Sequence, residues 1–114
     1  MLRSLALLAL PLALAGVICV ATPARRIAAE DAPPIDLGDP AIIHKGEELY
    51  GQTCRYCHGK EGQGGRGPTL RGRGFDYRHV FSRIINGYPP MPAFGQVYSP
   101  EQVWEIVAFV QSIK

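Results

Sequence analysis

Two cysteines and a histidine lie within five residues of one another, in the run Cys54-Arg55-Tyr56-Cys57-His58. This C-x-x-C-H spacing is typical of covalent haem attachment, in which both thiols bond to the ring and the histidine ligates the iron. Two cysteines three positions apart lie on one side of a helical turn, so both can reach one edge of the ring. The motif therefore predicts a fold built around one haem c, held by Cys54, Cys57 and His58.

Two other kinds of site use the C-x-x-C spacing. A structural zinc site needs a second pair of Cys or His ligands at short spacing, and the third of the three cysteines is Cys19, within the apolar N-terminal segment. A thioredoxin-like redox pair needs a strand–helix unit around it, and no such pattern is readable here. Haem attachment is the interpretation that we favour.

Met91 is the one methionine besides Met1, and it lies in a proline-rich run at residues 88–94. Proline fixes its own backbone and keeps the residue before it extended, so the Met91 thioether is presented on a stiff loop. We therefore predict that His58 and Met91 are the two metal ligands. An iron with both axial positions filled carries electrons and transforms no substrate.

Two alternatives to Met91 as a ligand stay open. Most methionines fill gaps in a core, and His79 could supply a second imidazole. Bis-histidine ligation would lower the reduction potential, whereas a histidine–methionine pair raises it. Because His79 falls inside a helical stretch and no other methionine competes, we favour Met91.

The hydrophobic pattern predicts an all-α domain of three to four helices. Asp39-Pro40 and Ser99-Pro100 each read as an N-cap followed by proline at the first helical position. A further helix is expected over 75–86, and the last helix should bury a stripe of apolar residues. That stripe consists of Val103, Ile106, Val107, Val110 and Ile113. Residues 59–74 contain seven glycines and one proline, which predicts a loop around the edge of the haem.

The N-terminus reads as an export leader. Arg3 is followed by an apolar run of about 17 residues, which is at the short limit for a membrane span. We predict a signal peptide at 1–24, or an uncleaved anchor that uses residues 4–22. A linker at 25–39 and a domain at 40–114 should follow. Cys19 is not expected to be a lipoprotein site, because it follows Ile18 where a small residue is required.

From Ile43 to Lys114, about two-thirds of the chain, the sequence resembles the small bacterial mono-haem form of the class I c-type cytochromes. The matching residues are, in chain order, Gly46, Tyr50, Cys54, Cys57, His58, residues 67–70, residues 86–87, residues 91–95, Trp104 and Phe109. The resemblance implies a cytochrome c-like fold in which Gly46 permits a close crossing with the last helix. It also implies that the Pro68 carbonyl holds the histidine ring and that Leu70 covers the haem.

Charge is distributed unevenly along the chain. The formal net charge is +2, which does not suggest a nucleic-acid partner. Between Cys54 and Arg83 there are seven basic residues and two acidic ones. Arg71 and Arg73 are our candidates to pair with haem propionates. The remaining basic residues are either a solvated surface or a ring that steers an acidic partner, and both interpretations stay open.

These observations predict a periplasmic electron carrier rather than an enzyme. Its partners would be a redox protein donor and a redox protein acceptor, such as a dehydrogenase, an oxidase or a reductase, and it would contact a membrane only if the leader is retained. One alternative is a cytochrome subunit fixed to a respiratory oxidase or a periplasmic dehydrogenase. Another is a five-coordinate haem that acts as a peroxidase or a gas sensor.

Overall fold

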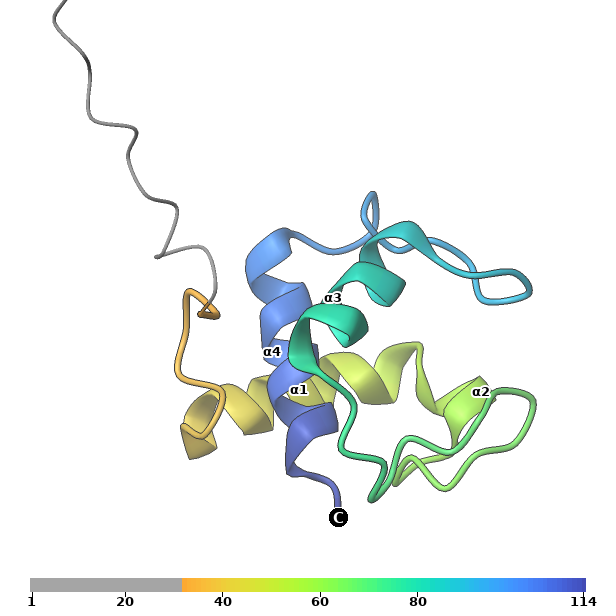
Figure 1. Ribbon diagram of the computed structural model, residues 1–114, viewed down its shortest axis with the longest axis horizontal. Coiled ribbons are helices and arrows are strands. Elements are labelled where there is room, and N and C mark those ends of the chain that lie inside the picture. Colours follow the sequence, from red (N-terminus) through yellow and green to blue (C-terminus); the bar gives the residue numbers. More distant parts are fainter. Residues whose placement is uncertain (1–31) are drawn as a thin grey trace, which may run out of the picture.

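The computed structural model describes residues 32–114, so the predicted leader and the first part of the predicted linker lie outside the described residues. In chain order the helices are α1 (Pro40–Gln52), α2 (Arg55–His58), α3 (Tyr77–Asn86) and α4 (Pro100–Ser112) (Figure 1). Within 32–114 no strand is present, only one isolated antiparallel bridge. The prediction of an all-α fold is confirmed. No helix in this part of the chain has the length and apolar character needed to cross a bilayer.

Side-chain caps begin the three longer helices. The Asp39 carboxylate accepts from the backbone amide of Ala41 at 2.8 Å, and Ser99 and Gln102 form the reciprocal capping box. Both caps were predicted. The third helix was expected from Phe75, but it begins at Tyr77. Its start is later because the Asp76 carboxylate accepts from the next free amides and therefore acts as the N-cap.

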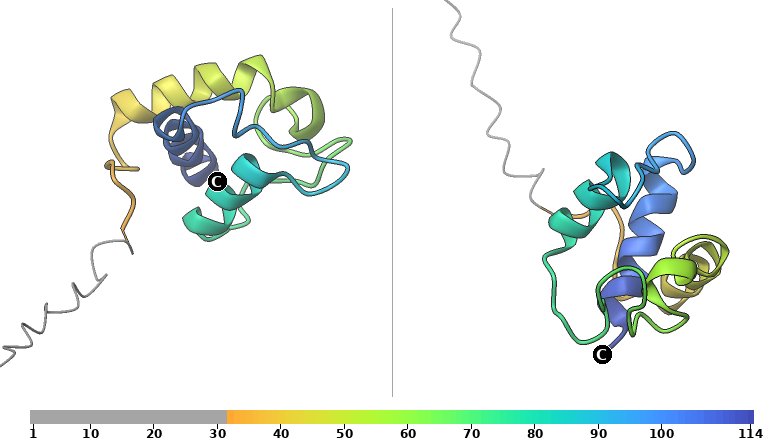
Figure 2. Two further views of the ribbon diagram at one scale, coloured as in Figure 1. Left: turned by 90° about the horizontal axis from the view of Figure 1, so that it is seen from above. Right: turned by 90° about the vertical axis from the view of Figure 1, so that its right-hand side faces the viewer.

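Helices α1 and α4 cross in close contact, as the two views in Figure 2 show. A Cβ atom added at Gly46 would overlap the backbone carbonyl of Glu105. The glycine, which costs about 1 kcal/mol in a helix interior, is therefore required by the crossing. Tyr50, one turn further along α1, packs its ring against Phe109 with centroids 4.9 Å apart.

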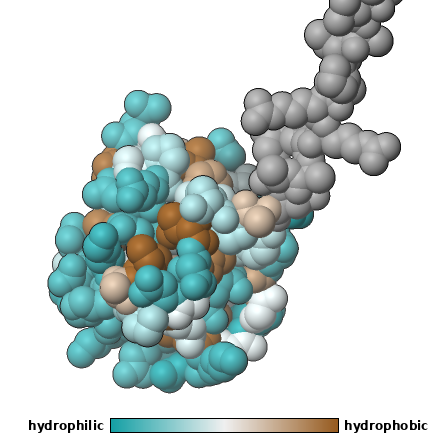
Figure 3. All heavy atoms as spheres, turned by 90° about the vertical axis from the view of Figure 1, so that its left-hand side faces the viewer, coloured by the Kyte–Doolittle hydropathy of each residue, from teal (hydrophilic) through white to brown (hydrophobic). Residues whose placement is uncertain are grey.

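The core centres on α4. Of the predicted stripe, Val103, Ile106, Val107 and Val110 are buried, whereas Ile113 is half-buried and directly follows the helix. These residues pack with Tyr50, Val80, Ile84, Tyr98 and Phe109 in one cluster. Most of the outward face on the side where α1 begins is hydrophilic, with one small group of apolar residues near its centre (Figure 3).

Two features near α1 were not predicted. Leu37 packs against the core cluster, so the packed part of the chain begins within the segment assigned to the linker. Glu105, on the inner side of α4, is buried and its carboxylate lies 3.6 Å from the Lys45 ammonium. A buried charge requires such a partner, and the pair therefore adds a polar contact to the crossing of α1 and α4.

Candidate haem-binding site

The remaining side of the bundle contains a cavity of about 660 Å³. In Figure 1 the segment with α2 lies at the lower right and the loop that follows α3 lies at the upper right, and residues of both line the cavity. Its floor is apolar and includes Leu70, Val80, Ile84, Ile106 and Val110. A volume of this size lies within the range of pockets that enclose a whole organic ligand.

The C-x-x-C-H motif lies at one wall of this cavity. Cys54 precedes the single turn of α2, and the amides of Cys57 and His58 both donate to the Cys54 carbonyl, at 3.2 and 3.0 Å. This turn brings both sulfur atoms to the same side, and all three residues line the cavity. Burial raises the pKa of the Cys54 thiol to about 11, so the free thiol is protonated.

A backbone carbonyl holds the His58 ring in place. His58 is 9 % exposed, and its Nδ1 lies 2.9 Å from the Pro68 carbonyl oxygen. Because a carbonyl accepts only, Nδ1 donates its proton there and Nε2 keeps the lone pair that binds a metal. Gly67 leaves room for this arrangement, since an added Cβ would lie 2.8 Å from Cε1 of the ring.

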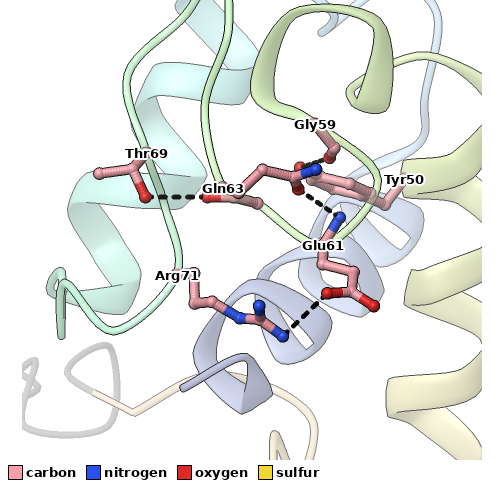
Figure 4. A network of polar contacts seen from close by, with 7 residues as sticks. Tyr50, Gly59, Glu61, Gln63, Thr69 and Arg71 are labelled. Carbon is pink, nitrogen blue, oxygen red and sulfur yellow. Dashed lines mark hydrogen bonds and ion pairs between the residues drawn. The ribbon is translucent and has the colours of Figure 1, made fainter.

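Hydrogen bonds fix the shape of the loop between α2 and α3 (Figure 4). The Gly62 carbonyl accepts from the Thr69 hydroxyl and from the amides of Leu70 and Arg71. The Tyr50 hydroxyl donates to the Gly59 carbonyl at 2.7 Å, and burial raises the pKa of this phenol to about 12. The Tyr50 hydroxyl therefore keeps its proton, and the loop is tied to α1 as well as to itself.

Met91 faces the same cavity from the opposite loop. Its amide and carbonyl pair with those of Tyr88 in the antiparallel bridge, at 2.8 and 3.0 Å. Further along, the Phe94 amide donates to the Ile84 carbonyl at 2.8 Å, which ties the loop to α3. Met91 is half-buried and packs against the core cluster. The structure thus brings Met91 and His58 to one cavity.

Other polar residues near the cavity and on α1 have different surroundings. His79 also lines the cavity, but the residue is exposed and its ring stacks on Phe75 at 6.1 Å. The Asn86 amide donates to Ser82, one turn back in α3. Tyr88 lines the cavity, whereas the exposed His44 lies on α1 beside Glu47 and Glu48.

Residues 41–110 match the family described as cytochrome C oxidase, cbb3-type, subunit III. The chain belongs to this family. It is also 44% identical over 54 residues to cytochrome c-551 of Bacillus subtilis, covering 46% of this chain and 48% of that protein. The cofactor is haem c, which forms covalent bonds with Cys54 and Cys57.

Larger proteins show further similarity. Quinohemoprotein alcohol dehydrogenase ADH IIB of Pseudomonas putida is 36% identical over 78 residues, which cover 64% of this chain and 11% of that enzyme. The cytochromes cL of Methylophaga aminisulfidivorans and Hyphomicrobium denitrificans superpose with TM-scores of 0.59 and 0.60, both at 26% identity. They match 67% and 70% of this chain. The chain spans about half the length of cytochrome c-551 and of these two structures.

The residues that surround the cavity fit a haem. The apolar cavity is lined by the two cysteines of the motif, by His58 with its oriented ring, and by the thioether-bearing Met91. In residues 32–114 no cluster of three or more His, Cys, Asp or Glu side chains suited to a bare metal ion is found. The charged residues at the cavity differ from those predicted. Arg71 pairs with Glu61 at 3.1 Å and Arg73 lies over the Phe75 ring, and neither lines the cavity.

Arg66 and Arg83 line the cavity instead. Arg71 and Arg73 were predicted as propionate partners, but the loop turns at Gly72 and Gly74, both of which have positive φ. Glycine adopts this backbone conformation without steric cost, and the arginines beside it are carried away from the cavity. Arg66 replaces them as our candidate to pair with a propionate.

Gly67→Ala is expected to destabilise the haem-bound protein by about 1–3 kcal/mol. The added carbon would press on the His58 ring and weaken its bond to Pro68. Denaturant unfolding, monitored by haem absorption, measures the change in stability. The ferric spectrum reports whether His58 binds the iron in the variant. An unchanged unfolding midpoint would show that the loop moves away from His58 at no cost.

Proposed function

We propose that this protein is a one-electron carrier in which His58 and Met91 occupy the two axial positions of its haem. The observation that supports this most strongly is that an imidazole oriented by Pro68 and a thioether on a tied loop line one apolar cavity. Bound haem supplies an iron that gains and loses one electron. With both positions filled by the chain, the protein binds no substrate and is not an enzyme.

The chain favours rapid transfer in three ways. His58 is fixed by the Pro68 carbonyl, and Met91 is fixed by its backbone bonds to Tyr88, so neither ligand has to move between redox states. The apolar lining keeps water away from the centre. Cys57 and the prolines beside Met91 are exposed, so the edge of the ring near them lies where a partner can approach.

We also propose the cellular setting that was predicted from the sequence. Residues 1–24 would act as a signal peptide or as a retained anchor, and residues 40–114 would function in the periplasm. The donor and the acceptor would be redox proteins. The matches to an oxidase subunit family and to parts of two dehydrogenases support a second candidate, a cytochrome held in a complex with such an enzyme. Co-purification of the full chain in a stoichiometric complex would favour that candidate.

Absorption spectra of the exported, haem-loaded protein test the ligand assignment. We expect the ferric protein to show the weak thioether-to-iron absorption band. In the ferrous state, carbon monoxide should bind no faster than the Met91 sulfur leaves the iron. Rapid carbon monoxide binding together with a missing thioether band would indicate a five-coordinate haem. That result would replace the carrier proposal with a peroxidase or a gas sensor.

A further inference from the structure

The tip of the methionine loop is attached to α3 by a side-chain contact. Arg83, in the last turn of α3, places its guanidinium carbon 4.1 Å from the centre of the Tyr88 ring. The other three contacts of this kind in residues 32–114 measure 5.0, 5.5 and 5.3 Å. The Arg83–Tyr88 contact is therefore the closest cation–π pair among the described residues, and it joins two segments that both line the cavity.

Tyr88 is coupled directly to Met91. The two residues exchange both backbone hydrogen bonds of the antiparallel bridge, at 3.0 and 2.8 Å. A displacement of Tyr88 therefore moves the backbone of Met91 with it. Tyr88 itself is 62% exposed, so burial contributes little to its position and the contact with Arg83 matters more.

Backbone hydrogen bonds to α3 hold the two ends of this loop. The Gly87 amide donates to the Arg83 carbonyl, and the amides of Phe94 and Gly95 donate to α3 at the other end. Between them, Pro89, Pro90 and Pro92 are all exposed and have no amide proton with which to add another tie. The Arg83–Tyr88 pair reaches into this middle part.

We propose that Arg83 and Tyr88 form a clamp that keeps the Met91 thioether at the iron. Both are positioning residues, since they act on the sulfur through the backbone of the loop. This inference rests on the proposed axial role of Met91. It predicts that loss of the clamp raises the fraction of molecules in which the sulfur has dissociated and an outside ligand can bind.

Imidazole titration of the ferric holoprotein measures that fraction. Apparent affinity scales with the population of the open form, and a cation–π pair at an exposed site changes such a population by about two- to five-fold. We expect Arg83→Gln and Tyr88→Leu each to lower the apparent Kd for imidazole by that factor. The double variant should show no larger change than either single one, because both remove the same contact.

Three control variants separate the clamp from other effects. Arg83→Lys and Tyr88→Phe keep a cation and an aromatic face, and both should bind imidazole much as the natural protein does. Arg78→Gln removes one positive charge from the same helix beside a different tyrosine, Tyr77, and should also leave the Kd unchanged. Imidazole is chosen because an anionic ligand would respond to the loss of charge itself.

The results distinguish the clamp from the ligand assignment beneath it. Unchanged affinity in Arg83→Gln and Tyr88→Leu, or effects that multiply in the double variant, would overturn the clamp while the thioether band persists in the natural protein. If that band is absent from the natural protein, the axial role of Met91 fails, and the clamp fails with it.

Discussion

Met91→Ala is expected to remove the thioether-to-iron band and to lower the reduction potential by on the order of 0.1 V or more, within the roughly 0.8 V that axial ligands span. The thioether stabilises the ferrous state, and the alanine side chain has no atom that can ligate the iron. Spectroelectrochemical titration of the purified holoprotein measures both changes. The ferrous variant should also bind carbon monoxide quickly, because one axial position is then open.

His79→Ala is the matched control for this experiment. His79 lines the same cavity. Its imidazole would therefore be the second iron ligand if Met91 is not. We expect this variant to keep the thioether band and a potential close to that of the natural protein. Loss of six-coordination in His79→Ala, combined with an unchanged ferric spectrum in Met91→Ala, would assign the ligand to His79.

Gly46→Ala is expected to cost about 3 kcal/mol or more in the free energy of unfolding, the upper part of the range for overpacking. The new methyl group would overlap the carbonyl of Glu105. Backbone cannot rotate away as a flexible side chain can, so α1 and α4 must separate. Denaturant unfolding of the holoprotein, followed by far-ultraviolet circular dichroism, measures the loss.

Gly51→Ala provides the control on the same helix. An added Cβ at Gly51 meets nothing within 4 Å, and alanine is favoured over glycine in a helix by about 1 kcal/mol. This substitution should therefore stabilise the protein or leave its stability unchanged. If both alanine variants were equally stable, the close crossing of α1 and α4 would not depend on Gly46.

Local chemistry explains which parts of the fold were predictable from the sequence. Asp39 and Ser99 cap helices through bonds to residues two or three positions away, so a short run of sequence contains both partners. The C-x-x-C-H turn is local in the same way. Gly46 was predicted through a family resemblance, because its partner Glu105 lies at the other end of the chain and no local pattern points to it.

The positions of the arginines were not predictable for a related reason. Whether Arg66, Arg71 or Arg73 reaches the cavity depends on the path of the glycine-rich loop, and successive positive φ values at Gly72 and Gly74 redirect that path. The ion pair with Glu61 then fixes Arg71 away from the cavity. The pairing of Arg83 with Tyr88 likewise depends on how the proline-rich loop folds back after α3.

The contact of Leu37 with the core determines where the chain enters the bundle. Residues 32–39 lie at the end where α1 begins, whereas α2 and the methionine loop lie at the far side (Figure 1). A membrane attachment upstream of residue 32 would therefore hold the molecule at the end where α1 begins. The haem cavity, at the far side, would stay free to reorient between one redox partner and the next, which a carrier tethered to a membrane requires.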